Sequence, residues 1–389
     1  MRPGAANPGK RRVQASRCDW IVVGAGIAGA SLAYWLAPHG RVVVLEQEAQ
    51  PGYHATGRSA ALYLPGYGPA QVRALTLASR EFLSNPPAGF ATAPILSPRG
   101  ALTFGTPAQR DLLERHFDSV RALGIAATRL DARGVCERVP VLHERLVAGG
   151  IFESDAFDID VGALLQGFLR GVRAHGGVIE CGAAVRAIGR EGADWWAGDG
   201  RRCWRAPVLV DAAGAWADAV AALAGVAPLH LQPKRRSAFL FRPPEGLEVR
   251  RLPSIIAVDE SFYVKPDAAM LLGSPANADP VPPHDVLAEA LDVATGIARI
   301  ERFTTLRIRR PTHVWAGLRT FTTDGCLVGG FDPLAPGFFW CAGQGGYGIQ
   351  SSPAMGEASA ALVQGRPLPA RLVGHGLDER TLGPARLRT

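Results

Sequence analysis

The fold is decided by the stretch DWIVVGAGIAGASLAYWLAPHGRVVVLE, residues 19–46. Residues 20–23 predict a short buried strand, and residues 28–37 carry the apolar periodicity of a helix. A second buried strand is predicted at 42–45, and Glu46 closes it. A strand, a helix and a second strand in this order predict the βαβ unit of a dinucleotide-binding fold.

A glycine-rich turn joins the first strand to the helix with G-x-G-x-x-G spacing. Gly24 permits the tight turn, Gly26 lets the backbone touch a pyrophosphate, and Gly29 lets helix and strand pack closely. The helix N-terminus presents free N–H groups and a positive dipole end to the phosphates. Glu46 stands 22 residues after Gly24, about where an acidic side chain binds a ribose diol. The turn residues expected to contact the cofactor are Gly24, Gly26, Ile27, Ala28 and Gly29.

Length and composition indicate an ordinary globular protein with more than one domain. A chain of 389 residues exceeds the roughly 250–300 residues of a single core. Its 42 basic and 35 acidic residues leave a net charge of +7, which favours solubility and anionic ligands. Basic and aromatic residues are not interleaved as on a nucleic-acid-binding surface, so we expect no nucleic-acid partner.

The six cysteines show neither a C-x-x-C pair nor a regular spacing, which argues against a metal centre or a redox dithiol. Reduced thiols in a cytoplasm are therefore expected. Residues 1–17 are polar, basic and rich in Gly and Pro, and we expect a disordered tail there. Arg11-Arg12 before the apolar stretch imitates a twin-arginine signal, but Asp19 and the glycine spacing favour a nucleotide-binding strand. No run approaches the roughly 20 apolar residues of a membrane-spanning helix.

The rest of the chain adds to this unit and inserts a second, antiparallel part. Short strands within 178–211 resemble a β-meander, and strands within 232–273 precede an amphipathic helix near 283–302. A second glycine turn, GQGGYGIQ at 343–350, leads into a helix at 349–363. The predicted fold class is α/β plus α+β: a Rossmann-like domain with a parallel sheet and a β-meander, and a substrate domain with an antiparallel sheet and covering helices. The predicted boundaries are 1–17 for the tail, 18–85, 150–222 and 315–376 for the discontinuous nucleotide-binding domain, 86–149 and 223–314 for the substrate domain, and 377–389 for a C-terminal tail.

Longer stretches carry a family resemblance. The first βαβ unit, VLVDAAGAW at 208–216 and FFWCAGQGGYGIQ at 338–350 resemble the D-amino-acid oxidase superfamily of FAD enzymes. HATGRSAA at 54–61, LQPKRRSAF at 231–239 and DESFYVKPD at 259–267 are similar to bacterial FAD-dependent D-arginine dehydrogenases. The resemblance covers nearly the whole chain after the tail and implies an FAD-dependent oxidoreductase.

The resemblance implies noncovalent FAD, because covalently flavinylated relatives carry a cysteine near the position of Leu318 that is absent here. Arg58 and Ser59 are expected near the flavin or its pyrophosphate, and Val185 at the adenine. An alternative for Arg58 is a surface loop charge. The N–H groups of the second glycine turn would face the anionic end of a reduced flavin. The other expected FAD contacts are Glu46, Gln47, Gly214, Gly345, Gly346, Tyr347, Gly348 and Ile349.

Oxidation of an amino acid requires a bound carboxylate, a Cα–H that faces flavin N5 and a neutral amine. A planar guanidinium binds a carboxylate bidentately, and Arg236 and Arg319 match the family positions that do so. Tyr67 and Tyr263 match family tyrosines that orient the same group, and Gln350 is expected at the flavin face. The alternative for Arg236 is a solvated charge in its Lys-Arg-Arg run.

No protein base is obligatory, because an amine whose pKa is lowered in a dry cationic pocket can release its proton to water. His54 could suggest a base, but a structural contact near the cofactor is the favoured interpretation. The expected reaction is oxidative deamination of a D-amino acid by hydride transfer from Cα to flavin N5. The product would be an imino acid, hydrolysed to a 2-oxo acid and ammonia.

Three residues predict which side chain the substrate carries. Family members that take basic D-amino acids have an acidic residue at the position of Ala101 and polar residues in place of Leu62 and Leu64. A guanidinium buried without a carboxylate costs on the order of several kcal/mol. We therefore predict an apolar D-amino acid, such as leucine, methionine, phenylalanine or valine, in preference to D-arginine.

Other interpretations stay open at this point. The same scaffold would oxidise a secondary amine such as sarcosine, proline or an opine. The first βαβ unit does not distinguish FAD from NAD, and the basic charge alone suggests a nucleic-acid binder. The electron acceptor is not written in the sequence, although the resemblance suggests a dehydrogenase that passes electrons to a quinone or a similar acceptor.

Overall fold

A computed structural model describes residues 15–388 of the chain. Its central element is a six-stranded sheet in which five neighbouring strands are parallel and the sixth, β21, is antiparallel. Each of the first strands is a short run of Val, Ile and Leu, as expected for strands buried on both faces. The strands in spatial order are β10 (Val178–Glu180), β3 (Val42–Leu45), β2 (Trp20–Val23), β14 (Val208–Asp211), β22 (Phe338–Ala342) and β21 (Val328–Phe331).

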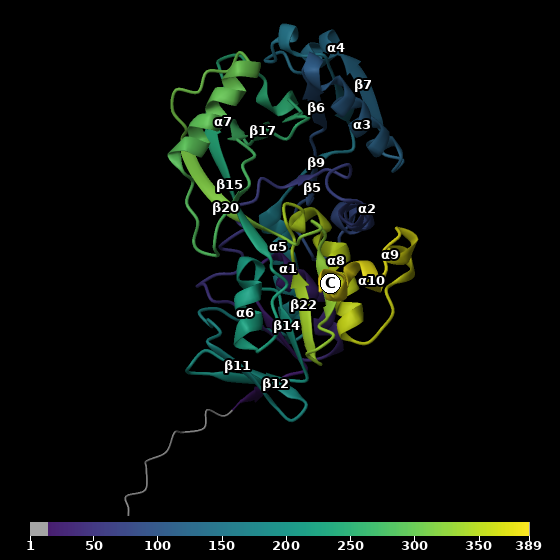
Figure 1. Ribbon diagram of the computed structural model, residues 1–389, viewed down its shortest axis with the longest axis vertical. Coiled ribbons are helices and arrows are strands. Elements are labelled where there is room, and N and C mark those ends of the chain that lie inside the picture. The colour runs from purple at the N-terminus through teal and green to yellow at the C-terminus, as the bar shows by residue number, and fades with distance from the viewer. Residues whose placement is uncertain (1–14, 389) are drawn as a thin grey trace, which may run out of the picture.

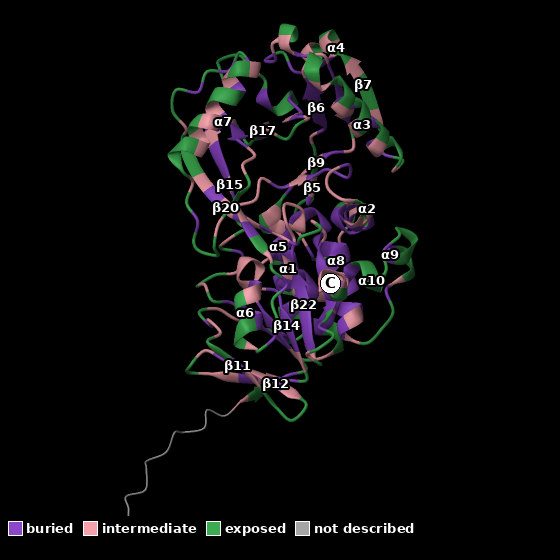
Figure 2. Ribbon diagram, viewed as in Figure 1, coloured by how far each residue is buried: buried purple, intermediate pink, exposed green. Residues whose placement is uncertain are grey.

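Helices of small residues cover one face of this sheet. α1 (Ile27–Leu36) packs against α5 (Val161–Ala174) and α8 (Gly348–Val363), and α8 also contacts α2 (Ala70–Ser84). The contact between α1 and α8 is close, because a Cβ at Gly356 would lie 2.8 Å from Ser31. Figure 2 shows α8 and the neighbouring strands almost entirely in the buried colour.

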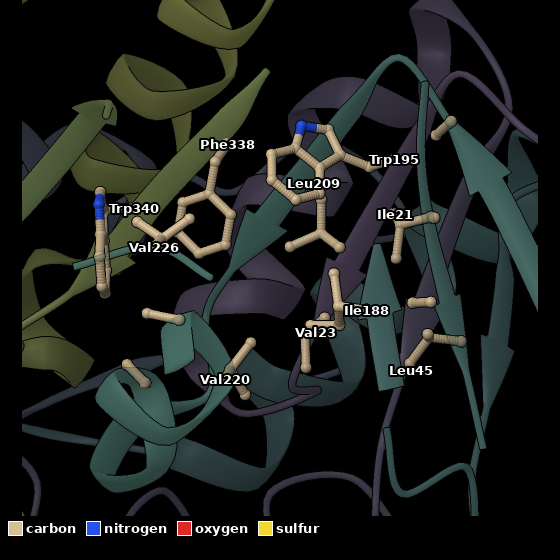
Figure 3. Close-up of a cluster of buried hydrophobic side chains, with 14 of the residues drawn as sticks. Ile21, Val23, Leu45, Ile188, Trp195, Leu209, Val220, Val226, Phe338 and Trp340 are labelled. Atoms are coloured by element: carbon tan, nitrogen blue, oxygen red, sulfur yellow. The ribbon is translucent and has the colours of Figure 1, made fainter. Parts of the chain in front are cut away.

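A second small sheet covers the other face and contains the predicted meander. Its strands are β11 (Ala187–Glu191), β12 (Asp194–Gly198), β13 (Cys203–Ala206) and β1 (Ser16–Arg17), and α6 (Ala217–Leu223) lies beside it. Figure 3 shows the core between the layers, where the Trp195 ring lies 5.8 Å from that of Phe338. Since Ser16 and Arg17 form a strand that pairs with Trp204 and Arg205, the predicted disordered tail is wrong at these two residues. Residues 1–14 of that prediction lie outside the described residues.

The other lobe is built on a nine-stranded sheet, and it lies at the opposite end of the molecule from the meander (Figure 1). Its long strands β15 and β20 pair with each other and run toward the first lobe. The strands along the sheet are β19 (Asp279–Pro280), β15 (Gln232–Phe241), β18 (Met270–Ser274), β17 (Tyr263–Asp267), β16 (Ser254–Ala257), β6 (Ala101–Gly105), β8 (Gly149–Glu153) and β7 (Ala127–Asp131), with β20 (His313–Phe321) on the free side of β15.

Short elements complete the two lobes. A three-stranded sheet of β4 (Leu62–Tyr63), β9 (Phe157–Ile159) and β5 (Leu96–Pro98) lies between them in Figure 1. Helices α3 (Arg110–Arg121), α4 (Ala132–Arg138) and α7 (Ala290–Phe303) cover the nine-stranded sheet, while α9 (Ala370–Gly374) and α10 (Glu379–Leu382) follow α8. The predicted fold class is confirmed. The exact domain boundaries stay a prediction.

Two segments differ from their predicted form for local reasons. The helix expected from residue 283 begins at Ala290, because Pro282 and Pro283 break the chain and Asp285 turns away to Arg58. The segment predicted as a C-terminal tail from residue 377 folds into α10 and a following turn, and Arg388 forms an ion pair with the buried Asp332.

Candidate active site

Three cavities with overlapping linings run from the six-stranded sheet into the space under the nine-stranded sheet. The first has a volume of about 250 Å³, the second about 90 Å³ and the third about 150 Å³. Ile27, Thr56 and Gln344 line both the first and the second, and Arg236 and Arg319 line both the second and the third. The cavities therefore form one candidate site that a long cofactor and a small ligand would share.

The first cavity opens at the carboxyl ends of β2, β3 and β14, where ligands bind in open parallel sheets. Gly24 has φ +104°, and a Cβ there would lie 2.5 Å from the carbonyl oxygen of Ala212. A Cβ at Gly29 would lie 2.0 Å from the carbonyl oxygen of Gly24. A Cβ at Gly26 would meet only Thr56 Oγ1, at 3.4 Å. Two glycines thus serve packing, and Gly26 leaves backbone open to the cavity.

The N-terminus of α1 faces this cavity, and the carboxylate of Glu46 bonds to the turn before the helix and not to the helix itself. Its N-cap Gly26 offers no side-chain cap, and no acidic residue stands in its first turn. Thr56 Oγ1 accepts a hydrogen bond from the N–H of Ile27. Glu46 Oε2 accepts one from Ala25, 2.8 Å away. The helix end is left for a phosphate, which suits the charge and the free N–H groups there.

The other predicted contacts of the nucleotide part fall on the same cavity. Ala28, Gln47, Val185 and Gly214 line it. Val185 does so from the segment just before β11. His54 also lines it and bonds to Glu48 Oε1 through Nε2 at 2.9 Å, which agrees with the structural interpretation of this histidine.

The second cavity lies between the two glycine turns. Gly345, Gly346, Gly348 and Ile349 line it from the start of α8, whose first turn again carries no acidic residue. A Cβ at Gly346 would lie 2.7 Å from Arg319 Nη1, so this glycine makes room for the guanidinium. Tyr347 does not line the cavity: it packs edge-on against Tyr67, with ring centroids 5.1 Å apart.

Arg58 and Ser59 reach the second cavity from the early loop. The guanidinium of Arg58, however, forms an ion pair with Asp285 at 2.5 Å and donates to the carbonyl oxygens of Val286 and Ala316. Arg58 is therefore neither a free surface charge nor a guanidinium free to bind a pyrophosphate. Its guanidinium links the early loop to the segments at Asp285 and Ala316. Arg58 still lines the second cavity, and its contact with the flavin stays a prediction.

The two arginines of the Lys-Arg-Arg run at 234–236 point to opposite faces of β15. Arg235 points to one face of β15, where it forms ion pairs with Asp279, Glu289 and Asp292. Arg236 points to the other face and lines the second and third cavities. The alternative of a solvated run therefore fails at Arg236.

Arg236 and Arg319 lie close together on one face of a strand pair. Arg236 is directly opposite Gly317 on β20, and Arg319 follows two residues later on the same face. Within residues 15–388 neither forms an ion pair, and Arg319 forms no hydrogen bond. Arg236 donates its Nε–H to the carbonyl oxygen of Asn277 at 2.5 Å. Burial, reinforced by the charge of Arg319, lowers the pKa of Arg236.

Two tyrosines and a glutamine surround this pair. Tyr67, Tyr263 and Gln350 line the third cavity together with Arg236 and Arg319. Burial raises the pKa of Tyr67 against the opposing effect of Arg319, so its hydroxyl stays protonated and can donate. Gln350 Oε1 accepts from the backbone N–H of Leu64 at 2.9 Å, while its buried Nε2 has no partner. The sequence-predicted catalytic residues thus meet in one place.

The third cavity continues between largely apolar walls. Leu62 and Leu64 line it, as predicted, together with Ile256 and Phe262. Ala101 does not, because its short side chain is fully buried in a cluster with Leu64. Sequence reasoning missed the polar residues of this lining: Thr103, His116, Ser254, Glu260 and Lys265. For Thr103, Ser254 and Lys265 the signal would have been a polar residue within an apolar strand, whereas His116 on α3 and the exposed Glu260 carry no such signal.

Two negative observations concern residues 15–388. No group of three or more His, Cys, Asp or Glu side chains in this range is arranged to hold a metal ion. Among the helices described, none has the length and apolar character needed to cross a bilayer.

A parallel sheet with a glycine turn at its carboxyl edge, joined to a cavity under a second sheet, defines a two-lobed dinucleotide-binding oxidoreductase. The family described as "DAO: FAD dependent oxidoreductase" matches residues 19–362, and the chain belongs to that family. Its cofactor is FAD, which resolves the choice between FAD and NAD. The free helix N-terminus and the open backbone at Gly26 fit the pyrophosphate of this group.

Relatives and solved structures of this kind extend over nearly the whole chain. FAD-dependent oxidoreductase domain-containing protein 1 of Bos taurus is 25% identical and aligns with 92% of this chain and 84% of its own. The structure of L-proline dehydrogenase from P. horikoshii matches with a TM-score of 0.82 at 18% identity, over 96% of this chain and 99% of that one. Glycine oxidase from Geobacillus kaustophilus matches with a TM-score of 0.78 at 23% identity, over 90% and 95%. These structures share the fold.

Proposed function

We propose that this protein is an FAD-dependent amino-acid dehydrogenase that oxidises D-amino acids with apolar side chains. One observation carries the proposal: Arg236 and Arg319 line the same cavity, and within residues 15–388 neither forms an ion pair with a carboxylate. Glu260 also lines this cavity, but it is exposed and offsets the charge of Arg236 only in part. Two neighbouring guanidinium groups that are half-buried and form no ion pair are unfavourable, and a carboxylate ligand offsets this cost. An amino-acid substrate supplies such a carboxylate.

The residues of the chain bind and orient this substrate. Arg236 and Arg319 hold the carboxylate, and the hydroxyls of Tyr67 and Tyr263 donate to it. Gln350 positions the substrate next to its amine through the side-chain amide nitrogen Nε2, which has no other partner. The positive charge of the arginines favours the neutral amine, whose proton leaves to water, and no histidine base is needed. The flavin, when bound, supplies a hydride acceptor for the Cα–H bond, and the imino acid then hydrolyses to a 2-oxo acid and ammonia.

The apolar walls support the choice of side chain. Leu62, Leu64 and Ile256 offer no partner for a guanidinium, and the carboxylate of Glu260 in the same lining is exposed and already faces the charge of Arg236. D-arginine is therefore expected to be a poor substrate despite the resemblance to D-arginine dehydrogenases. The second candidate is oxidation of a secondary amino acid, such as sarcosine, proline or an opine. The proline and glycine enzymes of the same fold favour it, and it needs the same carboxylate anchor.

The proposal also includes an electron acceptor for the reduced cofactor and a location of the protein in the cytoplasm. A quinone or a similar acceptor would reoxidise the cofactor. The six cysteines are all free, which agrees with a reducing cytoplasm.

Anaerobic reduction of the flavin by a substrate panel tests the proposal. The purified holoenzyme is mixed with D- and L-leucine, D-methionine, D-arginine, sarcosine and L-proline, and bleaching of the flavin absorbance is followed. We expect D-leucine and D-methionine to bleach fastest, and at least about 10-fold faster than D-arginine. A strong preference for D-arginine refutes the apolar assignment, and bleaching by sarcosine or L-proline alone establishes the second candidate.

A further inference from the structure

A buried carboxylate stands behind the wall of the third cavity, away from the arginine pair. Glu153, on β8, is 0% exposed, and both of its carboxylate oxygens lack a hydrogen-bond partner. The space around Oε2 is tight, because a Cβ at Gly66 would lie 2.8 Å from it. A carboxylate is rarely left in this state, since burial without hydrogen-bond donors is strongly unfavourable. Glu153 therefore needs a partner.

His116 on α3 is the group placed to be that partner. Its Nε2 lies 3.8 Å from Glu153 Oε1, and this nitrogen is also buried without a hydrogen bond. The same imidazole lines the third cavity. A small rotation of the ring would bring Nε2–H to the carboxylate, and this leaves Nδ1 with an acceptor lone pair on the other side of the ring.

A third unpartnered group completes this corner of the cavity. Glu153, Ala101 and Ser254 lie side by side on three adjacent strands, because Ala101 pairs with Glu153 on β8 and with Ser254 on β16. Directly paired residues point to the same face of a sheet. Ser254 is 2% exposed, its Oγ has no partner, and it lines the cavity. Between the two polar side chains, Ala101 contributes only a methyl group.

We infer that His116, held by Glu153, and Ser254 form a recognition subsite for a neutral polar group at the end of the substrate side chain. The inference rests on the carboxylate anchor of the proposed function, and it replaces the apolar preference by a preference for a short side chain that ends in a neutral polar group. Nδ1 of His116 accepts one hydrogen bond, and the hydroxyl of Ser254 donates one. A primary amide supplies the matching N–H and carbonyl oxygen. The apolar walls then contact the methylene part of a short side chain, and the subsite selects its end.

Binding of two unreactive carboxylates of equal shape tests the subsite. Succinamate and 4-methylpentanoate are asparagine and leucine without the amine, and they differ in an amide against an isopropyl group. Each is titrated into the oxidised holoenzyme, and Kd is taken from the change in flavin absorbance. Acetate, which has the carboxylate and no side-chain end, is the third ligand. We expect succinamate to bind at least about 10-fold more tightly than 4-methylpentanoate, since its amide forms two hydrogen bonds that the isopropyl group cannot form.

Variants of the subsite separate recognition from folding. Ser254→Ala and His116→Phe are each expected to reduce the preference for succinamate by about fivefold or more, and Glu153→Gln, which removes the charge that orients His116, to reduce it less. Acetate binding should stay unchanged in all three. His175→Phe, an exposed histidine at the end of α5, is the matched control and should change neither ratio.

The outcomes distinguish the two proposals. If acetate binds and 4-methylpentanoate binds as tightly as succinamate in the wild type, or if Ser254→Ala and His116→Phe leave the ratio intact, the subsite is overturned while the carboxylate anchor stands. If acetate and both analogues leave the flavin spectrum unchanged, the anchor at Arg236 and Arg319 fails, and the subsite that depends on it fails too.

Discussion

The first and third cavities are built in different ways. The first is formed mostly by backbone: the turn after β2, the start of α1 and the ends of neighbouring strands. The third is formed by side chains that come from β4, β6, β15, β16, β17, β20 and α3. A backbone site needs glycines at fixed spacing within a short stretch of chain. A side-chain site needs the whole fold before its members meet.

This difference decides how a substitution acts. In the first cavity a single methyl group collides with main-chain atoms, and the fold itself must give way. In the third cavity a lost side chain leaves the backbone in place and removes one contact to the ligand. We therefore expect the largest effects of small changes at the glycine turn, and effects confined to catalysis around the arginines.

Gly29→Ala is the sharpest test of the backbone site. Its Cβ would lie 2.0 Å from the carbonyl oxygen of Gly24, so helix and strand must separate. We expect a loss of stability of about 3 kcal/mol or more and purification without FAD, measured by thermal unfolding and by the flavin-to-protein absorbance ratio.

Gly26→Ala is the matched control for that variant. Its Cβ has 3.4 Å to Thr56 Oγ1, so the chain should fold with little loss of stability and bind FAD more weakly. Equal thermal stability of Gly29→Ala and the wild type would contradict the packing role of this glycine.

The same difference explains what could be predicted from the sequence. The βαβ unit and the second glycine turn with its helix follow from local spacing, and the structure contains them. The family resemblance predicted that Arg236 lines the active site. That Arg235 instead forms ion pairs follows from the opposite faces of β15 on which the two arginines lie. Glu153 was not predicted to matter, because its closeness to Ala101 comes from the pairing of β8 with β6, about 50 residues away in the chain. Such pairings are set by the tertiary fold and not by local pattern.

Adjacent arginines test the side-chain site within one strand. Arg236→Ala should leave stability and FAD content nearly unchanged and lower kcat/KM by about 10²–10³, because a buried carboxylate loses a charged partner. Arg235→Ala removes ion pairs to Asp279, Glu289 and Asp292. It should lower stability by about 2 kcal/mol with little change in kcat/KM, since two of the three acids are half-exposed. Similar kinetic losses in both variants would show that Arg236 acts through the fold and not on the substrate.

A pH-dependent effect is expected at Asp211, which lies beneath the first cavity at the end of β14. It is fully buried, its Oδ1 accepts from the N–H of Ala213, and its Oδ2 has no partner. Burial raises its pKa well above the usual 3.8. The unfolded chain therefore gives up this proton at a lower pH than the folded chain does. The stability it confers is complete below about pH 3.8 and is lost as the pH rises toward the folded-state pKa, by up to about 1.4 kcal/mol per pH unit.

Asp211→Asn keeps the acceptor and removes the titration. The stability of the variant relative to the wild type should rise between pH 5 and pH 7, measured as the difference in unfolding temperature at each pH. Asp285→Asn is the control with the opposite sign, because the hydrogen bond from Arg58 lowers the pKa of Asp285. The contribution of Asp285 is present above its usual pKa and is lost only as the pH falls below it, so its difference from the wild type should be constant from pH 5 to pH 7. If the stability difference between Asp211→Asn and the wild type is also constant from pH 5 to pH 7, the pKa of Asp211 is not raised. Its Oδ2 would then have a hydrogen-bond donor in solution, and the backbone site would tolerate an ionised carboxylate beneath it.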